Sequence, residues 1–517
     1  MRQKRVWQLS ALVLGALFFC RTAVGAVENE GENPPAKNPP AGNPLVANPL
    51  AASAAKHSLA GNWLGTLKVG AVSLRLAVAV TAKPDGSYTG TLNSLDQDAV
   101  AHAVDEVTLK GNAVHISFKK FLLNIDGTLN DAGTEITAKF KQGMAQLPIV
   151  FKKTDRAPEA RKRPQDPHPP YPYQAEEVTY ENKAAHAKFT GTLTIPRGSG
   201  RVPVVLLITG SGQQDRDEQI MGHRPFAVIA DYLTRRGIAV LRVDDRGVGG
   251  STGDVMHATS EDFAGDVLAG VEYLKTRSDI DPHQIGLIGH SEGGEIAPMV
   301  ANRSHDVAFI VLMAGPALPG DEIIMLQMEF ILKEGGASET MIAQTKVLQK
   351  RLYTLAKDKL EPAALKQKVK AAWAEYSAAL KPAERAQAGA GEASAEESAK
   401  MISLPWFRFF LAYDPRRALT QVKCPVLALI GEKDMQVPPK QNIPELEKAL
   451  RAGGNADFSV RELPKLNHLF QTCRTGSVSE YATIEETMSP TALEAIAQWV
   501  KEHTSSGKAP AHASQHQ

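Results

Sequence analysis

The chain has 517 residues, of which 43% are hydrophobic and 22% are charged, and its formal net charge is +1. One hydrophobic core rarely supports a chain of this length, so we expect two folded units and unstructured segments between them. The near-zero net charge and the lack of a long basic run argue against nucleic acid as a partner.

The amino terminus has the pattern of a secretory signal peptide. Basic residues at the start precede an apolar run over residues 6–19, and small residues follow at Val24-Gly25-Ala26. We expect cleavage after Ala26 and export of the protein, to the periplasm or the medium. The apolar run is shorter than the ~20 residues that cross a bilayer, so no stable membrane span is expected after cleavage. A retained single-pass anchor is the alternative reading.

The next segments indicate two linkers around a small β domain. Residues 27–58 repeat Asn-Pro and predict an extended linker. Residues 59–153 show short alternating runs with turn signals such as Asp126-Gly127, which are typical of a small antiparallel barrel or sandwich. We expect an accessory role for this domain, with a ligand-binding barrel as the alternative.

Residues 154–175, dense in proline and charge, form a second linker, and residues 506–517 are expected to be a disordered tail. The strand candidates of the β domain are Trp63–Val69, Ser73–Ala82, Ser87–Leu92, Ala113–Phe118, Leu122–Leu129, Glu135–Lys141 and Gln146–Phe151.

Residues 176–505 alternate between strand-like and helix-like patterns, which predicts a mostly parallel sheet with helices on both faces. Periodic apolar residues predict helices over 226–233 and 263–274, and Ser489 and Pro490 mark the start of the last helix. The buried strand candidates are Val202–Thr209, Ile238–Val243, Ile285–Gly289, Val307–Met313, Val426–Ile430 and Phe458–Leu463.

The interval 317–421 has no strand pattern and is rich in Ala, Lys and Glu. A structureless loop of that length is uncommon, so we expect a helical cap folded over the carboxyl edge of the sheet. Its least polar segment, 405–413, is expected either to pack in a core or to face an acyl pocket.

The pattern Gly-x-Ser-x-Gly occurs twice, around Ser251 and around Ser291. A nucleophile elbow requires a strand that runs into a tight turn and then a helix. Ser291 has this context, because the strand 285–288 precedes it and the small residues Gly293 and Gly294 open a helix after it. Ser251 lies between polar loop segments, so its glycines are interpreted as turn formers.

A serine nucleophile needs a histidine base, and the histidine needs a carboxylate. In folds that carry a nucleophile elbow, the order along the chain is Ser, then Asp or Glu, then His, each after a strand. Asp434 follows the strand 426–430, with Glu432 as the second choice, and His468 follows the last strand. His290, next to the nucleophile, is interpreted as a residue that lines the site.

Two backbone amides should stabilise the oxyanion. The amide of Glu292, directly after the nucleophile, is the first candidate. The second must come from the glycine-containing loop after the strand 202–209, where we favour Ser211 and keep Gly212 and Gln213 as alternatives. In the same loop, Asp215, Arg216 and Asp217 are expected to form structural ion pairs.

The motifs TGSGQQDRD, DDRGVGGSTGD, GHSEGG, GEKDMQVP and NHLF together resemble bacterial α/β-hydrolase esterases near the serine-aminopeptidase and dienelactone-hydrolase branches. The resemblance covers residues 176–503. It implies an α/β-hydrolase fold with a helical lid, behind a small antiparallel all-β domain, and a Ser291-His468-Asp434 triad. A serine replaces the cysteine nucleophile of dienelactone hydrolases.

These observations predict a serine hydrolase that cleaves a small-molecule ester through an acyl-enzyme. A peptidase or amidase of the same fold is the first alternative, and a non-catalytic surface binding protein is the second. No metal or organic cofactor is expected, because no His, Cys or carboxylate cluster has ligand spacing. The oligomeric state and the pairing of Cys424 with Cys473 remain open.

Overall fold

The structure is a computed structural model that describes residues 58–504 except 70–71, 98–99, 143–144, 199, 359 and 389. The predicted signal peptide, the Asn-Pro linker up to residue 57 and the tail from residue 505 lie outside the described residues. Within the described part of the chain, no helix is both long and apolar enough to cross a membrane.

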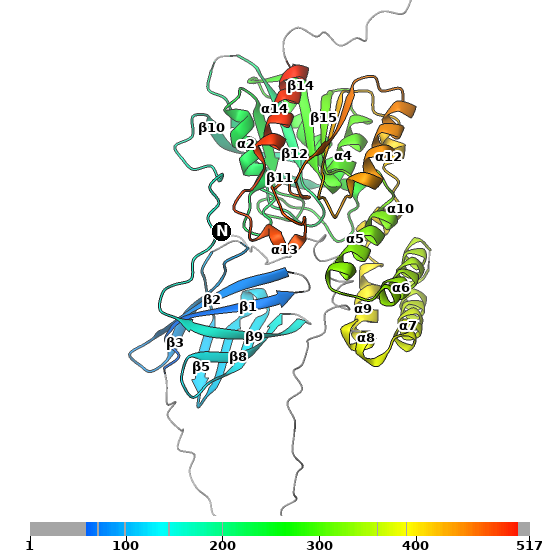
Figure 1. The fold of residues 1–517 in the computed structure, drawn as a ribbon. Helices are drawn as coiled ribbons and strands as arrows, with labels where there is room; N and C mark the ends of the chain where they lie inside the picture. The colour runs from blue at the N-terminus through cyan, green and yellow to red at the C-terminus, as the bar shows by residue number, and fades with distance from the viewer. Residues whose placement is uncertain are drawn as a thin grey trace, which may run out of the picture.

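The amino-terminal domain is one curved antiparallel sheet of nine strands in the order β4-β3-β2-β1-β9-β8-β7-β6-β5 (Figure 1). Alternate side chains, among them Trp63, Ile125 and Phe151, point inward and form its core, as expected for half-buried strands. Two short strands, β4 and β5, were not predicted, because β4 has two residues and β5 has five, of which only Val107 and Leu109 are apolar. The strands are β1 (Gly61–Val69), β2 (Val72–Ala82), β3 (Tyr88–Ser94), β4 (His102–Ala103), β5 (Glu106–Lys110), β6 (Ala113–Phe118), β7 (Leu123–Leu129), β8 (Glu135–Gln142) and β9 (Ala145–Thr154).

The second domain contains an eight-stranded sheet in the order β10-β11-β13-β12-β14-β15-β16-β17. The six strands from β13 to β17 in this order pair in parallel, as predicted, while β10 and β11 form an antiparallel hairpin at one edge. This hairpin was missed, although β11 alternates apolar and polar residues from Ala187 to Ile195 as a strand does. The strands are β10 (Gln174–Asn182), β11 (Ala187–Ile195), β12 (Val202–Ile208), β13 (Ala239–Val243), β14 (Ile280–His290), β15 (Val307–Met313), β16 (Val426–Gly431) and β17 (Phe458–Leu463).

Helices cover both faces of this sheet, so it has two apolar cores. The helices α3 (Ser260–Lys275), α4 (Glu292–Ala301) and α12 (Pro439–Ala452) pack on one face. The helices α2 (Pro225–Thr234) and α14 (Pro490–Thr504) pack on the other. The predicted helix positions are therefore confirmed for α2, α3 and α14.

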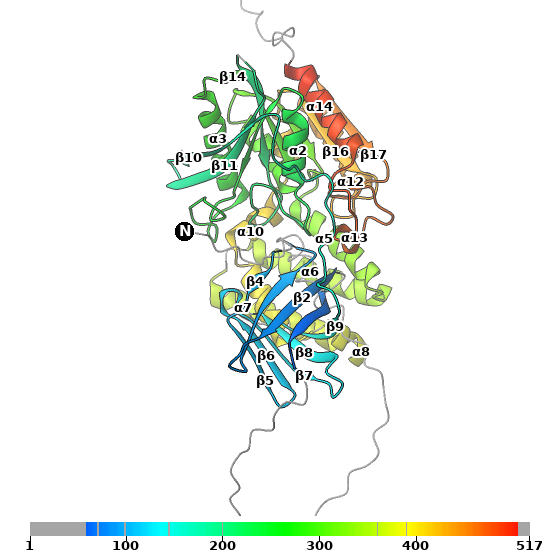
Figure 2. The same cartoon turned by 90° about the vertical axis from the view of Figure 1, so that its left-hand side faces the viewer.

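The interval between β15 and β16 is helical, as predicted, and has an apolar core of its own. Phe407, Phe410 and Leu411 belong to that core, which settles the interpretation of the segment 405–413 in favour of packing. Figures 1 and 2 place this cap and the β domain at the same end of the parallel sheet. The cap helices are α5 (Gly320–Glu334), α6 (Glu339–Lys357), α7 (Pro362–Ala379), α8 (Pro382–Gln387), α9 (Glu392–Met401), α10 (Pro405–Ala412) and α11 (Arg416–Leu419).

The β domain docks on the α/β domain through a small apolar cluster and one arginine. Val72 and Leu74 of β2 pack with Leu469 and Tyr481. Arg163, in the linker between the domains, donates hydrogen bonds to the carbonyl oxygens of four residues: Met221, Gly222, Ala482 and Ile484. A guanidinium suits this position because it carries five donors in one plane.

We predict that Arg163→Met lowers the free energy of unfolding by about 2 kcal/mol or more, because several half-buried carbonyl groups lose a charged donor. Urea denaturation followed by tryptophan fluorescence measures the change. Arg351→Met is the matched control, since Arg351 is 45% exposed and pairs with one exposed glutamate. Equal stability of the two variants would contradict a clamping role for Arg163.

Candidate active site

Ser291 stands at a sharp turn between β14 and α4. Its φ is +54° and its ψ is −117°, a backbone conformation that L-residues rarely adopt outside functional turns. The neighbouring glycines make the turn possible by close approach: a Cβ on Gly289 would lie 2.0 Å from the Gly293 carbonyl oxygen, and one on Gly293 would lie 2.3 Å from the Ile208 carbonyl oxygen. This geometry is that of a nucleophile elbow.

The second Gly-x-Ser-x-Gly match has a structural role. The hydroxyl of Ser251 donates to the carbonyl oxygen of Asp244 at 2.6 Å and accepts from the amide of Thr190 at 3.0 Å. The first bond closes the loop after β13 on itself, and the second fixes it against β11. The interpretation of this segment as a turn is thus consistent with the structure.

Asp434 and His468 lie in contact. The Nδ1 atom of His468 is 2.9 Å from Oδ2 of Asp434, and both side chains are buried. The other carboxylate oxygen accepts from the amides of Gln436 and Val437, which fixes the carboxylate plane. Glu432, the second choice for the acid, instead accepts from the amide of Lys465.

His468 and Ser291 line the same pocket, and Ser211 lines it as well. The Nε2 atom of His468 is buried and has no hydrogen-bond partner among the described residues, so the ring nitrogen remote from Asp434 is unengaged. No hydrogen bond joins Ser291 to His468 in the described chain; the two side chains share the pocket wall.

Buried carboxylates hold the loop after β12, where the second oxyanion donor was predicted. Oε1 of Glu218 accepts from the amide of Gly210 at 2.7 Å, and Oδ2 of Asp245 accepts from the amide of Gln214 at 2.8 Å. Among the hydrogen bonds of the described residues, none takes the amides between these two anchors, those of Ser211, Gly212 and Gln213. All three predicted candidates therefore stay open. The amide of Glu292 is the first in α4 and, like other first-turn amides, has no partner within the helix.

Arg216 and Asp217 of the same loop form structural ion pairs, as expected, and Asp215 accepts hydrogen bonds from the amides of Asp217 and Gln219. Arg216 pairs with Asp244 at 2.7 Å, and Asp217 pairs with both Arg224 and Arg242. Burial lowers the pKa of Arg242 to about 10. Burial also holds the pKa of Asp245 well above its usual range.

The carboxyl group of Glu292 connects the elbow to the cap. Its Oε1 atom accepts from the hydroxyl of Ser260 at 2.6 Å and from Nε1 of Trp406, on α10, at 2.8 Å. Burial raises the pKa of Glu292. Trp406 was not singled out from the sequence, because nothing local shows which residue of a distant helix reaches the elbow.

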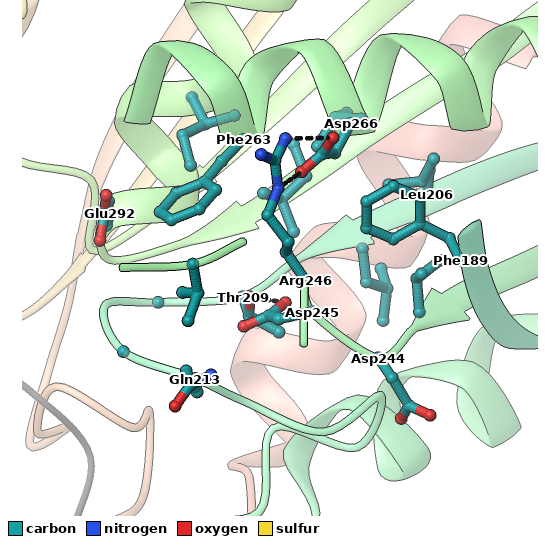
Figure 3. A pocket seen from close by; sticks show the side chains of 18 of the residues that line it. Phe189, Leu206, Thr209, Gln213, Asp244, Asp245, Arg246, Phe263, Asp266 and Glu292 are labelled. Carbon is teal, nitrogen blue, oxygen red and sulfur yellow. Dashed lines mark hydrogen bonds and ion pairs between the residues drawn. The ribbon is translucent and has the colours of Figure 1, made fainter. Parts of the chain in front are cut away.

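A second pocket, with about 640 Å³ of empty space, borders the loop after β12 (Figure 3). It borders the loop at Gly210 and Gly212, and Glu292 lines it. Much of the remaining lining is apolar, including Phe189, Leu206 and Phe263. The Arg246–Asp266 ion pair is also part of the wall.

The described residues contain no group of His, Cys, Asp and Glu that could hold a metal ion. Cys424 and Cys473 are both free thiols. They do not form a disulfide, which settles a question that the sequence left open.

The strand order, the helices on both faces and the elbow between β14 and α4 define an α/β-hydrolase. Residues 223–472 match the family model described as serine aminopeptidase, S33. The match covers 250 of the 517 residues, a little under half of the chain, and over that range the chain is similar to this family of α/β-hydrolases.

A relative and two solved structures illustrate the similarity. Esterase EstD of Thermotoga maritima is 34% identical over 165 residues, which are 31% of this chain and 39% of the relative. The chain thus spans about two fifths of that relative's length. An esterase of Pyrococcus furiosus is 16% identical, with 66% of this chain and 96% of that chain covered and a TM-score of 0.37. Est1E of Butyrivibrio proteoclasticus, solved with ferulic acid, is 15% identical, with 63% and 96% covered and a TM-score of 0.35.

The buried acid Glu295 on α4 generates a pH-dependent prediction. Burial, and then the nearby Glu292, hold its pKa well above its usual range, and its Oε1 atom has no partner among the described residues. The folded protein therefore binds this proton more tightly than the unfolded chain does. The stability that results is complete below the unfolded-state pKa and is lost as the pH rises toward the folded-state pKa.

We predict that Glu295→Gln matches the wild type near pH 4.5 and becomes more stable than it as the pH rises, by about 1.4 kcal/mol per pH unit until the folded-state pKa is reached. Urea denaturation from pH 4.5 to 9 measures the difference. Glu447→Gln, which alters a 40% exposed side chain on α12, is the control. A constant difference between Glu295→Gln and the wild type would show that Glu295 is ionised in the folded protein.

Proposed function

We propose that this protein is a serine esterase that cleaves carboxylic esters through an acyl-enzyme. The observation that carries the proposal is the buried Asp434–His468 pair, whose unengaged Nε2 lies in the same pocket as Ser291. The family match and the similarity to an esterase support it.

In the proposed reaction, Ser291 Oγ attacks the ester carbonyl carbon while Nε2 of His468 takes the hydroxyl proton. Asp434 keeps the Nδ1 proton in place and stabilises the imidazolium. The oxyanion forms hydrogen bonds with the amides of Glu292 and Ser211, where losing one such donor typically reduces the rate by ~10² to 10³. The imidazolium then protonates the leaving alcohol. Water, activated by His468, hydrolyses the acyl-enzyme by the same steps in reverse.

The elbow has a further consequence for this chemistry. Because Ser291 precedes α4, the oxyanion would form at the helix amino terminus, where backbone amides and the helix dipole favour negative charge. The apolar pocket of Figure 3 supports an ester with an apolar acyl group, because it borders the oxyanion loop at Gly210 and Gly212.

A peptidase or amidase is the second candidate, favoured by the name of the matching family model. The same groups cleave amides, so the two candidates differ in the substrate that the pockets accept.

We predict that Ser291→Ala lowers kcat for p-nitrophenyl esters by about 10⁴-fold or more and abolishes labelling by a fluorophosphonate. Ser251→Ala, in the other Gly-x-Ser-x-Gly match, is the control and should keep the labelling. Labelling that survives in Ser291→Ala would refute the assignment of the nucleophile.

The substrate class is tested by comparing p-nitrophenyl esters of increasing acyl length with aminoacyl anilides. The proposal expects turnover of the esters and a dependence of kcat/KM on acyl length. Turnover of the anilides alone would favour the peptidase.

Export after signal cleavage is part of the proposal, supported by the pattern of residues 1–26. We predict that the mature protein recovered from a bacterial periplasm or medium begins at Val27. Amino-terminal sequencing tests this prediction, and a cytoplasmic product that begins at Met1 would contradict it.

A further inference from the structure

His290, the residue before the proposed nucleophile, makes two hydrogen bonds in the protein interior. Its Nδ1 atom lies 2.9 Å from Oε1 of Glu218, and its Nε2 atom lies 3.0 Å from the carbonyl oxygen of His468. The side chains of His290 and Glu218 are 5% and 1% exposed. The contacts therefore lie out of solvent, where hydrogen bonds to charged groups are strong.

The partners of the two ring nitrogens fix the protonation state. A carbonyl oxygen only accepts, so Nε2 must donate to His468. An ionised carboxylate also only accepts, and the same Oε1 atom already accepts from the amide of Gly210 at 2.7 Å, so Nδ1 must donate as well. A ring that donates from both nitrogens is an imidazolium.

These bonds connect the two loops on which the proposed reaction depends. One end is the amide of Gly210, at the start of the oxyanion loop. The other end is the backbone of His468 itself, whose ring centroid is 4.9 Å from that of His290. The hydrogen bonds thus run from the Gly210 amide through the side chains of Glu218 and His290 to the His468 carbonyl oxygen.

We propose that His290 is a positioning residue, held as an imidazolium by Glu218, that fixes the spacing between the oxyanion loop and the loop of the catalytic base. The proposal rests on the proposed function for its kinetic consequence. It assigns no bond-making role to His290, since both of its nitrogens are occupied by donation.

The charges around the ring agree with this assignment. Burial lowers the pKa of His290, but the negative charge of Glu218, the hydrogen bonds to Glu218 and to the His468 carbonyl oxygen, and the charge of Asp434 outweigh it, so the pKa is raised. The titratable groups that face the ring are Glu218 from the loop after β12, Asp434 from the loop after β16 and His468 from the loop after β17. An uncharged partner in place of Glu218 should let the ring lose its proton at a lower pH.

The first experiment measures the protonation state without any substrate. In ¹⁵N-histidine-labelled wild-type protein at pH 8, we expect one histidine whose two ring nitrogens are both protonated. Its signals should vanish in His290→Gln and change to those of a neutral ring in Glu218→Gln. His257→Gln is the matched control, because His257 also pairs with a carboxylate, that of Asp254, but is 81% exposed. A wild-type spectrum at pH 8 in which His290 is neutral would overturn the proposal, even if both variants failed to fold.

The second experiment measures the kinetic consequence. Glu218→Gln keeps an oxygen that can accept from Gly210 but removes the charge. We expect kcat for an ester to fall by about 10- to 100-fold in this variant while KM changes less than about threefold, because an oxyanion contact acts in the transition state.

The loss in Glu218→Gln should grow toward alkaline pH, as His290 becomes neutral and gives up one of its two bonds. His290→Gln should lose a similar factor. The double variant should be no worse than the more impaired single variant, because the two residues act as one unit. Folded single variants with wild-type kcat, or with a raised KM alone, would overturn the proposal. If the wild type turned over no ester, the proposed function would fail, and the spectrum would still decide the protonation state of His290.

Discussion

The site depends on how closely the start of α4 approaches the sheet. At Gly289, Gly293 and Gly294 a single added carbon would overlap backbone atoms of the elbow, of β12 or of Gly315. Because these backbones nearly touch, the chain must turn within one residue, and Ser291 takes up the strained conformation that results. The strain is maintained by two cores, one on each face of the sheet, which hold β14 and α4 in register. The hydroxyl of Ser291 therefore projects at the carboxyl edge of the sheet without any flexible segment to orient it.

Near the elbow, buried carboxyl groups hold the loop after β12 in place. Asp244, Asp245 and Glu218 each accept a backbone amide of the segment 210–216. An ionised acceptor in the interior makes a stronger bond than a neutral one, but it needs a nearby cation or it takes up a proton. Arg216 provides the cation for Asp244 and His290 provides it for Glu218. Among the residues that the structure describes, Asp245 has no such cation beside it, which is consistent with its raised pKa.

The parts of the site that could be predicted are those that follow from chain order. In a parallel sheet every strand delivers its following loop to one edge, so Asp434 after β16 and His468 after β17 had to lie near the loop that holds Ser291. The structure places Asp434 and His468 in contact and brings His468 to the pocket of Ser291. The Glu218–His290 and Glu292–Trp406 contacts could not be predicted in the same way. They join residues 72 and 114 positions apart, and each depends on one side chain's reach rather than on periodicity. The edge strands β4, β5 and β10 were missed because they are short or contain few apolar residues. β11 lies inside the sheet, and its alternating sequence was overlooked.

The two accessory parts act on the site from different sides. The cap touches the elbow through Trp406 of α10, whose Nε1 atom donates to the carboxyl group of Glu292. The β domain touches the loops that line the pocket of Ser291, because Leu469 and Tyr481 belong both to that pocket and to the apolar cluster under β2. A residue shared by a binding wall and a domain interface cannot move without altering both. The docking of the β domain therefore helps to set the shape of the pocket. The linker residue Arg163 donates to carbonyl groups close to Tyr481, so it holds this part of the pocket wall in place without lining the pocket itself.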